Sequence, residues 1–321
     1  MKKSITFVFP GQGSQRVGMG LELYQSHEKA REVFEIVDEA LQQKLSDIIF
    51  NGSDDELKLT YNAQPALMAV SMAIVKVLEH ELNSKISNFV DIVLGHSLGE
   101  YSGLCSINSI DLVDTAKVLR VRGNAMQNAV KDIETRMIAV IGLGLEEIES
   151  KLLMFNKDDS FICEVANDNC PGQVILSGLK PSLDKIEDEL KKFGARSIID
   201  LQVSAPFHCS LMKPASVEMK EALENVKIKK PSIRFLNNVS ADFISNPEEI
   251  KSKLIEQVYK RVRWRESILK VSKSNIKTIV EVGSGKVLTG LNKRMKISQK
   301  LMNLDSMADI ENFVKIVGEN L

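Results

Sequence analysis

A serine framed by two glycines, directly after a short apolar segment, is the feature that most constrains how this chain can fold. Residues 90–94 are expected to form a buried strand, and Gly95-His96-Ser97-Leu98-Gly99 follows at once. This is the G-x-S-x-G pattern of a strand-to-helix elbow, in which a strained turn exposes a nucleophilic serine. Glycine on both sides lets strand and helix approach each other without Cβ clashes. The pattern therefore predicts Ser97 as a nucleophile at the start of a helix.

The elements expected around this elbow alternate between strands and helices. Strands are expected over residues 5–9, 90–94, 234–236 and 278–282. Helices are expected from an N-cap at Ser26, from Pro65 as the first helical residue, and over 111–130 and 307–317. Such alternation is typical of a parallel sheet covered by helices. We therefore predict a large α/β domain, similar to the α/β-hydrolases, built from residues 1–130 and 204–321.

The middle of the chain has a different order of elements. Hydrophobic periodicity predicts strand, helix, strand, strand, helix and strand over residues 137–142, 145–155, 161–166, 173–177, 181–193 and 196–201. A turn-rich segment, Asp168-Asn169-Cys170-Pro171-Gly172, separates the second and third of these strands. The order βαββαβ is that of a ferredoxin-like unit. We therefore predict a small ferredoxin-like α+β domain, residues 131–203, inserted into the large one.

Histidine is scarce, which narrows the choice of a base for the serine. The four histidines are His27, His80, His96 and His208. A serine hydroxyl needs a base to be nucleophilic near neutral pH. His96 adjoins Ser97 in sequence and is badly placed to reach its hydroxyl, and His27 and His80 lie near the ends of polar helices. His208, in the loop that leaves the inserted domain, is therefore predicted to be the base.

The loop after the first strand is a candidate for stabilising negative charge. Elbow enzymes bind the oxyanion with the backbone N–H after the nucleophile and with another from a loop after an early strand. Here these groups are the N–H of Leu98 and the N–H of Gln12, in the loop Pro10-Gly11-Gln12-Gly13. The same loop does not fit a dinucleotide-binding G-x-G-x-x-G turn, because Arg16 stands where the last glycine belongs.

Composition and missing motifs exclude several other classes. Lys plus Arg total 42 and Asp plus Glu 43, a formal net charge of −1, so the whole chain is not a strongly basic nucleic-acid binder. The four cysteines form no C-x-x-C pair, and no apolar run is long enough for a membrane span. The H-E-x-x-H and Walker A patterns fail, so no metal and no cofactor are expected. We expect a cytoplasmic protein that binds neither nucleic acid nor membrane.

Seven short segments, spread from one end of the chain to the other, carry a family resemblance. They cover residues 7–15, 95–101, 122–127, 166–174, 206–214, 257–264 and 281–288. Each is weak alone, but their order and spacing resemble the malonyl-CoA:acyl carrier protein transacylases and related acyltransferases of fatty acid and polyketide synthesis. The resemblance implies a ping-pong transfer of malonyl from malonyl-CoA to the phosphopantetheine thiol of acyl carrier protein. Ser97 would carry the malonyl ester and His208 would move the proton.

The resemblance also assigns three further residues. It implies that a backbone carbonyl at Gln257, and not a carboxylate, orients the histidine. It implies that Arg122 pairs with the malonyl carboxylate, where helical periodicity alone leaves Arg120 and Arg122 open. Phe207, immediately before the histidine, would crowd an α-methyl group, which favours malonyl over methylmalonyl.

Two alternatives remain at this stage. An α/β-hydrolase-type serine esterase or thioesterase would need an acidic partner for the histidine, and Asp200 is the best candidate. A non-catalytic module that only binds acyl carrier protein is the other. Acyl carrier proteins are acidic, so a basic docking surface is expected, with the candidates Lys286, Lys293, Arg294 and Lys296. We expect the protein to be a monomer.

Overall fold

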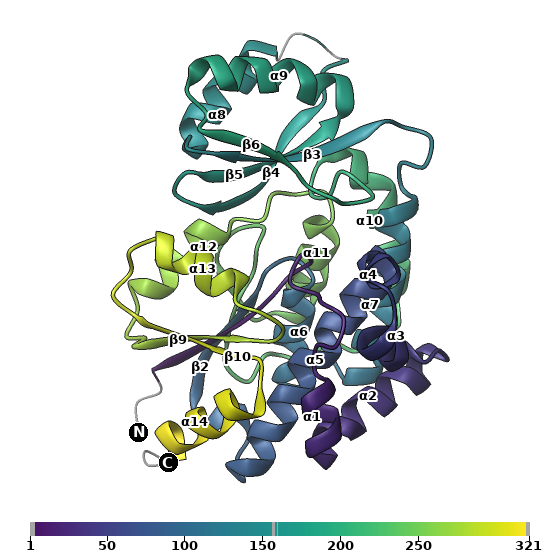
Figure 1. Ribbon diagram of the computed structural model, residues 1–321, viewed down its shortest axis with the longest axis vertical. Helices are drawn as coiled ribbons and strands as arrows, with labels where there is room; N and C mark the ends of the chain where they lie inside the picture. Colours follow the sequence, from purple (N-terminus) through teal and green to yellow (C-terminus); the bar gives the residue numbers. More distant parts are fainter. Residues whose placement is uncertain (1–3, 156–157, 159, 319–321) are drawn as a thin grey trace.

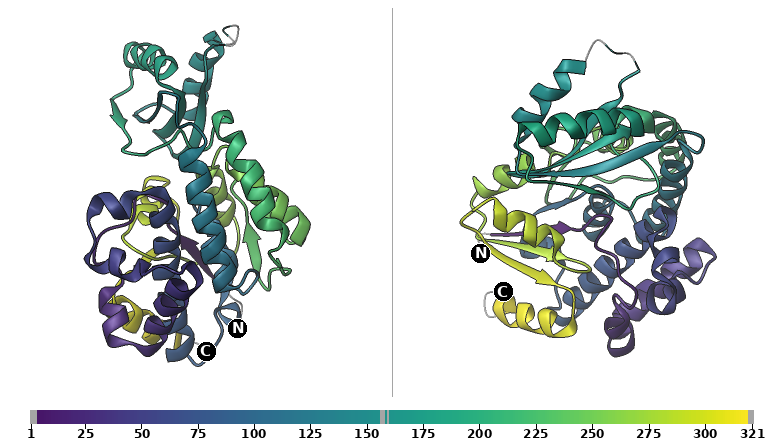
Figure 2. Two further views of the ribbon diagram at one scale, coloured as in Figure 1. Left: turned by 90° about the vertical axis from the view of Figure 1, so that its right-hand side faces the viewer. Right: turned by 45° about the horizontal axis from the view of Figure 1, so that its top comes forward.

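The computed structural model describes residues 4–155, 158 and 160–318. It contains two separate β-sheets, one of six strands and one of four. Figure 1 shows the four-stranded sheet and its helices at one end of the molecule, and the six-stranded sheet with most of the helices below it. The views in Figure 2 show the same division from two other sides.

The six-stranded sheet, called the large sheet below, is almost entirely parallel. Its order is β10 (Lys300–Leu304), β9 (Thr278–Val282), β1 (Ile5–Phe9), β2 (Val90–Gly95), β7 (Arg234–Leu236) and β8 (Phe243–Ile244). Only the pair β7 and β8 is antiparallel. Phe9 at the end of β1 lies opposite Gly95 at the end of β2. The loops that follow these two strands therefore leave the same edge of the sheet, where ligands of open α/β sheets bind.

Helices pack around the large sheet, directly or on one another, and the strands of this sheet are apolar on both sides. The helices are α1 (Leu21–Ser26), α2 (Glu28–Leu41), α3 (Leu45–Asn51), α4 (Asp54–Lys58), α5 (Thr60–Glu81), α6 (Gly99–Ser106), α7 (Leu112–Asn128), α10 (Lys213–Glu224), α11 (Pro247–Gln257), α12 (Trp264–Ser272), α13 (Val287–Arg294) and α14 (Met307–Gly318). Phe7 and Phe9 of β1 pack into one apolar cluster, and Val8 between them packs into another around Trp264. In the part of the chain described, the helices lack the combination of length and apolar content that a bilayer crossing requires.

Two helix starts differ from the sequence-based expectations. Helix α5 begins at Thr60, because the Leu59 carbonyl accepts hydrogen bonds from the N–H groups of Asn62 and Ala63. Pro65, expected as the first helical residue, therefore lies inside the helix. Pro65 lies in the second turn, where its missing N–H costs one helical hydrogen bond. Helix α2 is capped by His27, one residue after Ser26, since the His27 Nδ1 accepts the N–H of Lys29.

The four-stranded sheet, called the small sheet below, has the order β4 (Cys163–Cys170), β5 (Gln173–Leu179), β3 (Thr135–Ile141) and β6 (Ser197–Asp200). All its pairs are antiparallel, and α8 (Leu145–Leu152) and α9 (Lys180–Phe193) pack on it around an apolar cluster of their own. Along the chain these elements follow the predicted order βαββαβ. Strand β4 extends further than expected, through Cys170, so that Pro171 and Gly172 alone form the turn to β5. Three 3₁₀ turns complete the described structure: Ile86–Asn88, Leu153–Phe155 and Ser210–Met212.

Candidate active site

The turn between β2 and α6 is as tight as the glycine pattern predicts. Ser97 has a backbone φ of 54°, a left-handed conformation that costs energy for a residue other than glycine. A Cβ atom on Gly95 would lie 1.9 Å from the carbonyl carbon of Gly99, and one on Gly99 would lie 2.2 Å from the carbonyl oxygen of Phe9. Both positions therefore require glycine. The Asn238 side chain braces the turn, accepting the Ser97 N–H at 2.8 Å and donating to the Gly95 carbonyl at 2.8 Å.

Ser97 and His208, distant in sequence, form a direct hydrogen bond. Ser97 Oγ lies 2.8 Å from His208 Nε2, and His208 Nδ1 lies 2.7 Å from the backbone carbonyl oxygen of Gln257. Because a carbonyl only accepts, Nδ1 carries the ring proton and Nε2 presents its lone pair to the serine. Burial, reinforced by the charge of Arg122, lowers the pKa of His208 to about 3. The imidazole is thus neutral and able to accept a proton at neutral pH.

Arg122 of α7 brings a buried positive charge to the same serine. Its Nη2 lies 3.0 Å from Ser97 Oγ and 2.8 Å from Gln257 Oε1, and its Nη1 lies 2.8 Å from Gln64 Oε1. Its residue surface is 1% exposed, and no ion pair joins it to a carboxylate within the residues described. A guanidinium that has only neutral partners is suited to binding an incoming carboxylate.

The choice between the two arginines is resolved by geometry. Arg120 is half-buried, donates to Asn62 Oδ1 at 2.9 Å and lies over the ring of Tyr61. It does not line the cavity at the serine, whereas Arg122 does. The residue selected by the family resemblance is therefore the one that the fold brings to Ser97.

A small cavity opens in front of the serine. Its volume is about 90 Å³. Its walls come from the loops after β1 and β2, from α5 and α7, from β3 and β4 of the small sheet and from the segment after β6: Gln12, Gln64, His96, Ser97, Leu98, Arg122, Met126, Met137, Asn167, Leu201, Val203, Phe207 and His208. The cavity thus lies where the two sheets meet, and Phe207 forms part of its wall beside the histidine.

The backbone N–H groups of Gln12 and Leu98 are free at this cavity. Neither of them donates to an acceptor within the described ranges, whereas the N–H of Ser97 is bonded to Asn238. The Gln12 side chain donates to Thr60 Oγ1 at 3.4 Å, which fixes the loop after β1. Two unused donors that line a cavity beside a serine hydroxyl have the arrangement expected of an oxyanion site.

A buried polar network behind the serine was not predicted from the sequence. Gln257 Nε2 donates to the Ser97 carbonyl at 2.9 Å and also to Glu100 Oε2, while Glu100 Oε1 accepts the Asn238 N–H at 2.7 Å. Glu100 is fully buried, and burial raises its pKa to about 8, although both hydrogen bonds and the Arg122 charge act in the opposite direction. A single charged residue, Glu100, in the otherwise uncharged and fully buried α6 is the one sequence signal that could have revealed this network.

Asp200, the acid required by the hydrolase alternative, is not near the histidine. It lies on β6 with its side chain 53% exposed, and its two oxygens accept hydrogen bonds from Arg136 Nε and Nη2. His96 is also turned away from Ser97, with its Nε2 3.0 Å from Asn169 Oδ1 and its ring against Trp264. Gln257 occupies the position that a triad carboxylate would fill.

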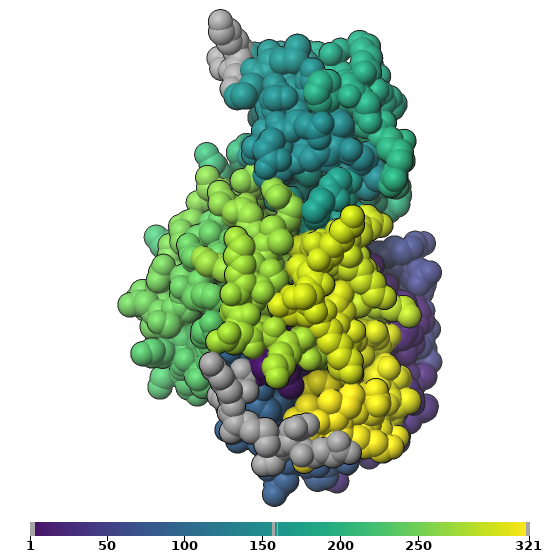
Figure 3. Space-filling model, turned by 90° about the vertical axis from the view of Figure 1, so that its left-hand side faces the viewer, coloured from purple at the N-terminus to yellow at the C-terminus, as the bar shows by residue number. Residues whose placement is uncertain are grey.

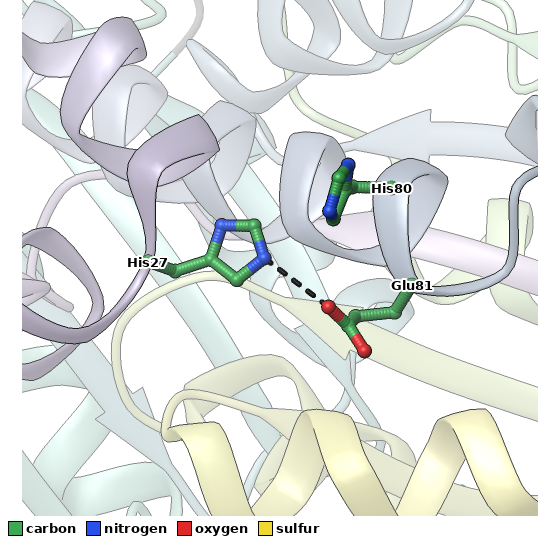
Figure 4. Close-up of side chains that lie close together, drawn as sticks. All are labelled: His27, His80 and Glu81. Atoms are coloured by element: carbon green, nitrogen blue, oxygen red, sulfur yellow. Dashed lines mark hydrogen bonds and ion pairs between the residues drawn. The ribbon is translucent and has the colours of Figure 1, made fainter.

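His27, His80 and Glu81 form a cluster in which a metal could be considered (Figure 4). Within the described part of the chain, this is the group of histidine and acidic side chains close enough to share an ion. However, His27 Nδ1 accepts the Lys29 N–H at 3.1 Å, which leaves the ring proton of neutral His27 on Nε2, 3.3 Å from Glu81 Oε1. A protonated nitrogen has no lone pair for a metal. The cluster therefore fits a helix cap with a hydrogen-bonded histidine.

The parallel sheet, the serine elbow and the histidine partner define the class of serine enzymes that transfer acyl groups. Comparison with known proteins narrows this class. The Acyl transferase domain family matches residues 6–303. The malonyl CoA-acyl carrier protein transacylase of Bacillus subtilis (strain 168) is 41% identical over 315 residues, covering 98% of each chain. The chain therefore belongs to the acyltransferase family, in the group of the malonyl CoA-acyl carrier protein transacylases.

Solved structures agree with this assignment. The acyl-carrier-protein-S-malonyltransferase of Bartonella henselae superimposes with a TM-score of 0.94 at 46% identity, covering 98% of this chain and 99% of the other. A malonyl-transacylase in complex with its type II PKS acyl-carrier protein superimposes with a TM-score of 0.92 at 32% identity, covering 98% and 100%. The mixed α/β fold with a largely parallel sheet is thus that of the acyltransferases.

Proposed function

We propose that this protein transfers a malonyl group from malonyl-CoA to the phosphopantetheine thiol of an acyl carrier protein, a step of fatty acid biosynthesis. The observation that carries the proposal is the 3.0 Å approach of Arg122 Nη2 to Ser97 Oγ inside a cavity of about 90 Å³. A nucleophile and a carboxylate-binding cation share one small site. The names of the relatives, transacylases that act with malonyl CoA and acyl carrier protein, support the same conclusion.

In the first half of the reaction Ser97 Oγ attacks the thioester carbonyl carbon of malonyl-CoA. His208 Nε2, 2.8 Å away, accepts the hydroxyl proton as the carbon–oxygen bond forms. The carbonyl oxygen becomes an oxyanion and accepts the backbone N–H groups of Gln12 and Leu98. When the carbon–sulfur bond breaks, the CoA sulfur takes the proton from His208. A malonyl ester on Ser97 and free CoA result.

The second half reverses these roles with a different thiol. The phosphopantetheine thiol gives its proton to His208, and its sulfur attacks the ester carbonyl carbon. The ester bond to Ser97 breaks, Oγ recovers the proton, and malonyl-acyl carrier protein leaves. The Gln257 carbonyl accepts a hydrogen bond from the His208 Nδ1–H group throughout, so the neutral imidazole always has the same tautomer.

Arg122 binds the malonyl carboxylate and so selects the substrate. A guanidinium can form two parallel hydrogen bonds with a carboxylate, which adds geometry to charge. Because Arg122 lowers the pKa of His208, a carboxylate that offsets this positive charge makes the base stronger. Phe207 favours malonyl over methylmalonyl by occupying the space that an α-methyl group would need. Discrimination by one such group in a pocket is worth about 1–3 kcal/mol.

We also propose that the two sheets belong to two domains. The large sheet with its elbow fits an α/β-hydrolase-like catalytic domain of residues 1–130 and 204–321. The small sheet, with the element order βαββαβ and a separate apolar cluster, fits an inserted ferredoxin-like domain of residues 131–203. The cavity at their junction supports a role for both in holding the acyl group.

A docking surface for acyl carrier protein follows from charge. Lys286, Lys293, Arg294 and Lys296 are all exposed and belong to α13 or its flanks. In Figure 3 the yellow surface around α13 lies directly below the teal surface of the part of the chain that holds the small sheet. An acidic carrier fits such a surface, and reversing these charges is expected to weaken transfer most at low salt. A monomeric state, a cytoplasmic location and the absence of a cofactor stay predictions.

Transfer itself is tested by incubating the protein with malonyl-CoA and holo-acyl carrier protein and measuring malonyl-carrier by mass spectrometry. We expect malonyl-carrier to form with wild type and to be absent with Ser97→Ala. Free malonate in place of malonyl-carrier would show hydrolysis and contradict the proposal. Apo-carrier, which lacks the thiol, is the matched control and is expected to stay unmodified.

A further inference from the structure

Glu100 is a buried acid that the proposed reaction does not use. It lies one turn after Ser97 on α6 and has no exposed surface. Burial of a carboxyl group is costly unless its oxygens are satisfied. Here Oε1 accepts the backbone N–H of Asn238 at 2.7 Å, and Oε2 accepts Nε2 of Gln257. The carboxyl group is therefore fixed in one position close to the active site.

The amide of Gln257 connects this acid to the arginine of the site. Its Nε2 donates to Glu100, and its Oε1 accepts Arg122 Nη2 at 2.8 Å. One side-chain amide therefore separates the buried carboxyl group from the buried guanidinium. Arg122 has no carboxylate bonded to it directly within the described ranges, so Glu100 is the nearest acid that can share its charge.

Few other titratable groups among the described residues face Glu100. From α7 comes Arg122, and from α6 itself comes Tyr101, whose pKa is raised by burial. Through Gln257 the network reaches His208, which is neutral near pH 7. Helix α5 contributes the uncharged Gln64 to Arg122, and β1 carries no titratable side chain. The acid of β2, Asp91, pairs with Arg234 at the other end of its strand.

The charge of the site changes when an acyl group with its own carboxylate enters. In the free protein one guanidinium faces one carboxyl group. A malonyl carboxylate that bonds to Arg122 adds a second acid around the same cation. Two carboxylates that share one positive charge in a dry site do not both stay ionised easily. The malonyl group touches the guanidinium directly and Glu100 does so only through an amide, so Glu100 is the one to hold the proton.

We propose that Glu100 is a specificity-determining residue whose protonated form favours malonyl over acetyl at Ser97, and whose ionised form removes that preference. The inference rests on the proposed function, because it requires Arg122 to bind the malonyl carboxylate. When Glu100 is ionised it shares the charge of Arg122 and repels the malonyl carboxylate. An acetyl group has no carboxylate and is indifferent to this change. Since burial raises the pKa of Glu100 to about 8, the change falls in an accessible pH range.

A competition experiment tests this directly. Wild-type protein is offered equal malonyl-CoA and acetyl-CoA from about pH 6 to 9.5, and the ratio of malonyl to acetyl on Ser97 is read by intact mass. We expect the ratio to be constant at low pH and to fall by up to about tenfold for each pH unit above Glu100's titration, as one proton is lost. In Glu100→Gln, which cannot ionise, the ratio is expected not to change with pH. A matched control is Glu281→Gln, another fully buried acid, whose oxygens accept the N–H groups of Leu288 and Thr289 away from the cavity.

A flat ratio in wild type, or an equal fall in Glu100→Gln, would overturn the inference. A second measurement needs no variant: proton uptake on acylation, followed with an indicator dye in weak buffer near pH 8. Malonyl-CoA is expected to cause a larger proton uptake per site than acetyl-CoA does, because the malonyl carboxylate favours protonation of those Glu100 groups that start ionised. Equal values for the two donors would contradict the role of Glu100. Absence of any malonyl adduct at all pH values would instead contradict the proposed function.

Discussion

His208 Nδ1 lies 2.7 Å from the backbone carbonyl oxygen of Gln257, so an uncharged peptide group orients the proposed base. A carboxylate in this position would stabilise a charged imidazolium, whereas a carbonyl fixes the tautomer without adding a negative charge. The buried acid of the site, Glu100, instead contacts Gln257 through the side-chain amide. This arrangement separates the group that orients the base, the Gln257 carbonyl, from the buried acid that reaches Arg122 through the Gln257 side chain.

The surface acid Asp200 should therefore be dispensable for acylation. It bonds to Arg136 and has no contact with His208. We expect Asp200→Asn to form the malonyl adduct within about twofold of the wild-type rate, as for most exposed substitutions. Rapid-quench mass spectrometry measures this rate. A loss approaching the ~10⁴-fold effect of removing a triad aspartate would instead support a hydrolase triad.

The pH profile of acylation should lack an acidic limb from the histidine. Because burial and the Arg122 charge lower the pKa of His208 to about 3, its neutral form persists well below the ordinary range of histidine. We expect kcat/KM for malonyl-CoA, which reports free-enzyme groups, to show no loss due to His208 between about pH 7 and 5. In Arg122→Gln the missing positive charge should move the pKa of His208 upward. Half-maximal activity near pH 6.5 in wild type would instead show a histidine with an ordinary pKa.

Arg122 and Arg120 offer a matched pair two residues apart on α7. Loss of two hydrogen bonds to a charged group, at about 1.5–3 kcal/mol each, should reduce malonyl loading of Arg122→Ala by about 100-fold or more. Acetyl loading should fall far less, since acetyl has no carboxylate. Arg120→Ala, which loses the hydrogen bond to Asn62 and the contact with the Tyr61 ring, should keep the wild-type ratio of malonyl to acetyl. An equal loss of both acyl groups in Arg122→Ala would count against its assignment as the carboxylate ligand.

Stability should depend sharply on one of the elbow glycines. A methyl group on Gly99 would lie 2.2 Å from the Phe9 carbonyl oxygen, so strand and helix would have to separate. We expect Gly99→Ala to lower the free energy of unfolding by about 3 kcal/mol or more, as buried backbone clashes do. Gly290 on α13 has no atom near its missing Cβ, and Gly290→Ala should raise stability by up to about 1 kcal/mol. Urea denaturation compares the two, and similar values for both would show that the elbow tolerates a side chain.

The sequence predicted those parts of the site that depend on local pattern. The elbow follows from Gly95 and Gly99, whose spacing is imposed by the close backbone approach. His208 followed by elimination, because so few histidines are present. Helix α5 shows the limit of such patterns: Pro65 suggested a helix start, but packing and the Leu59 carbonyl extend the helix by five residues.

The residues behind the serine could not be predicted in this way. Gln64, Asn238 and Glu100 act through hydrogen bonds that join segments far apart in the chain. An uncharged amide gives no periodic or compositional signal, and its role appears only when the fold brings its partner near. The tertiary contact between His27 and Glu81 was likewise invisible in the sequence.

In the proposed reaction Ser97 carries a malonyl ester formed with the help of His208. The most direct measurement is the intact mass of the protein after brief exposure to malonyl-CoA, followed by peptide mapping. We predict one malonyl group on Ser97 in wild type, none in Ser97→Ala, and almost none in His208→Ala, with unchanged circular dichroism spectra as the control for folding. Wild-type protein that stays unmodified, or Ser97→Ala that is malonylated like wild type, would show that Ser97 is not the acyl carrier.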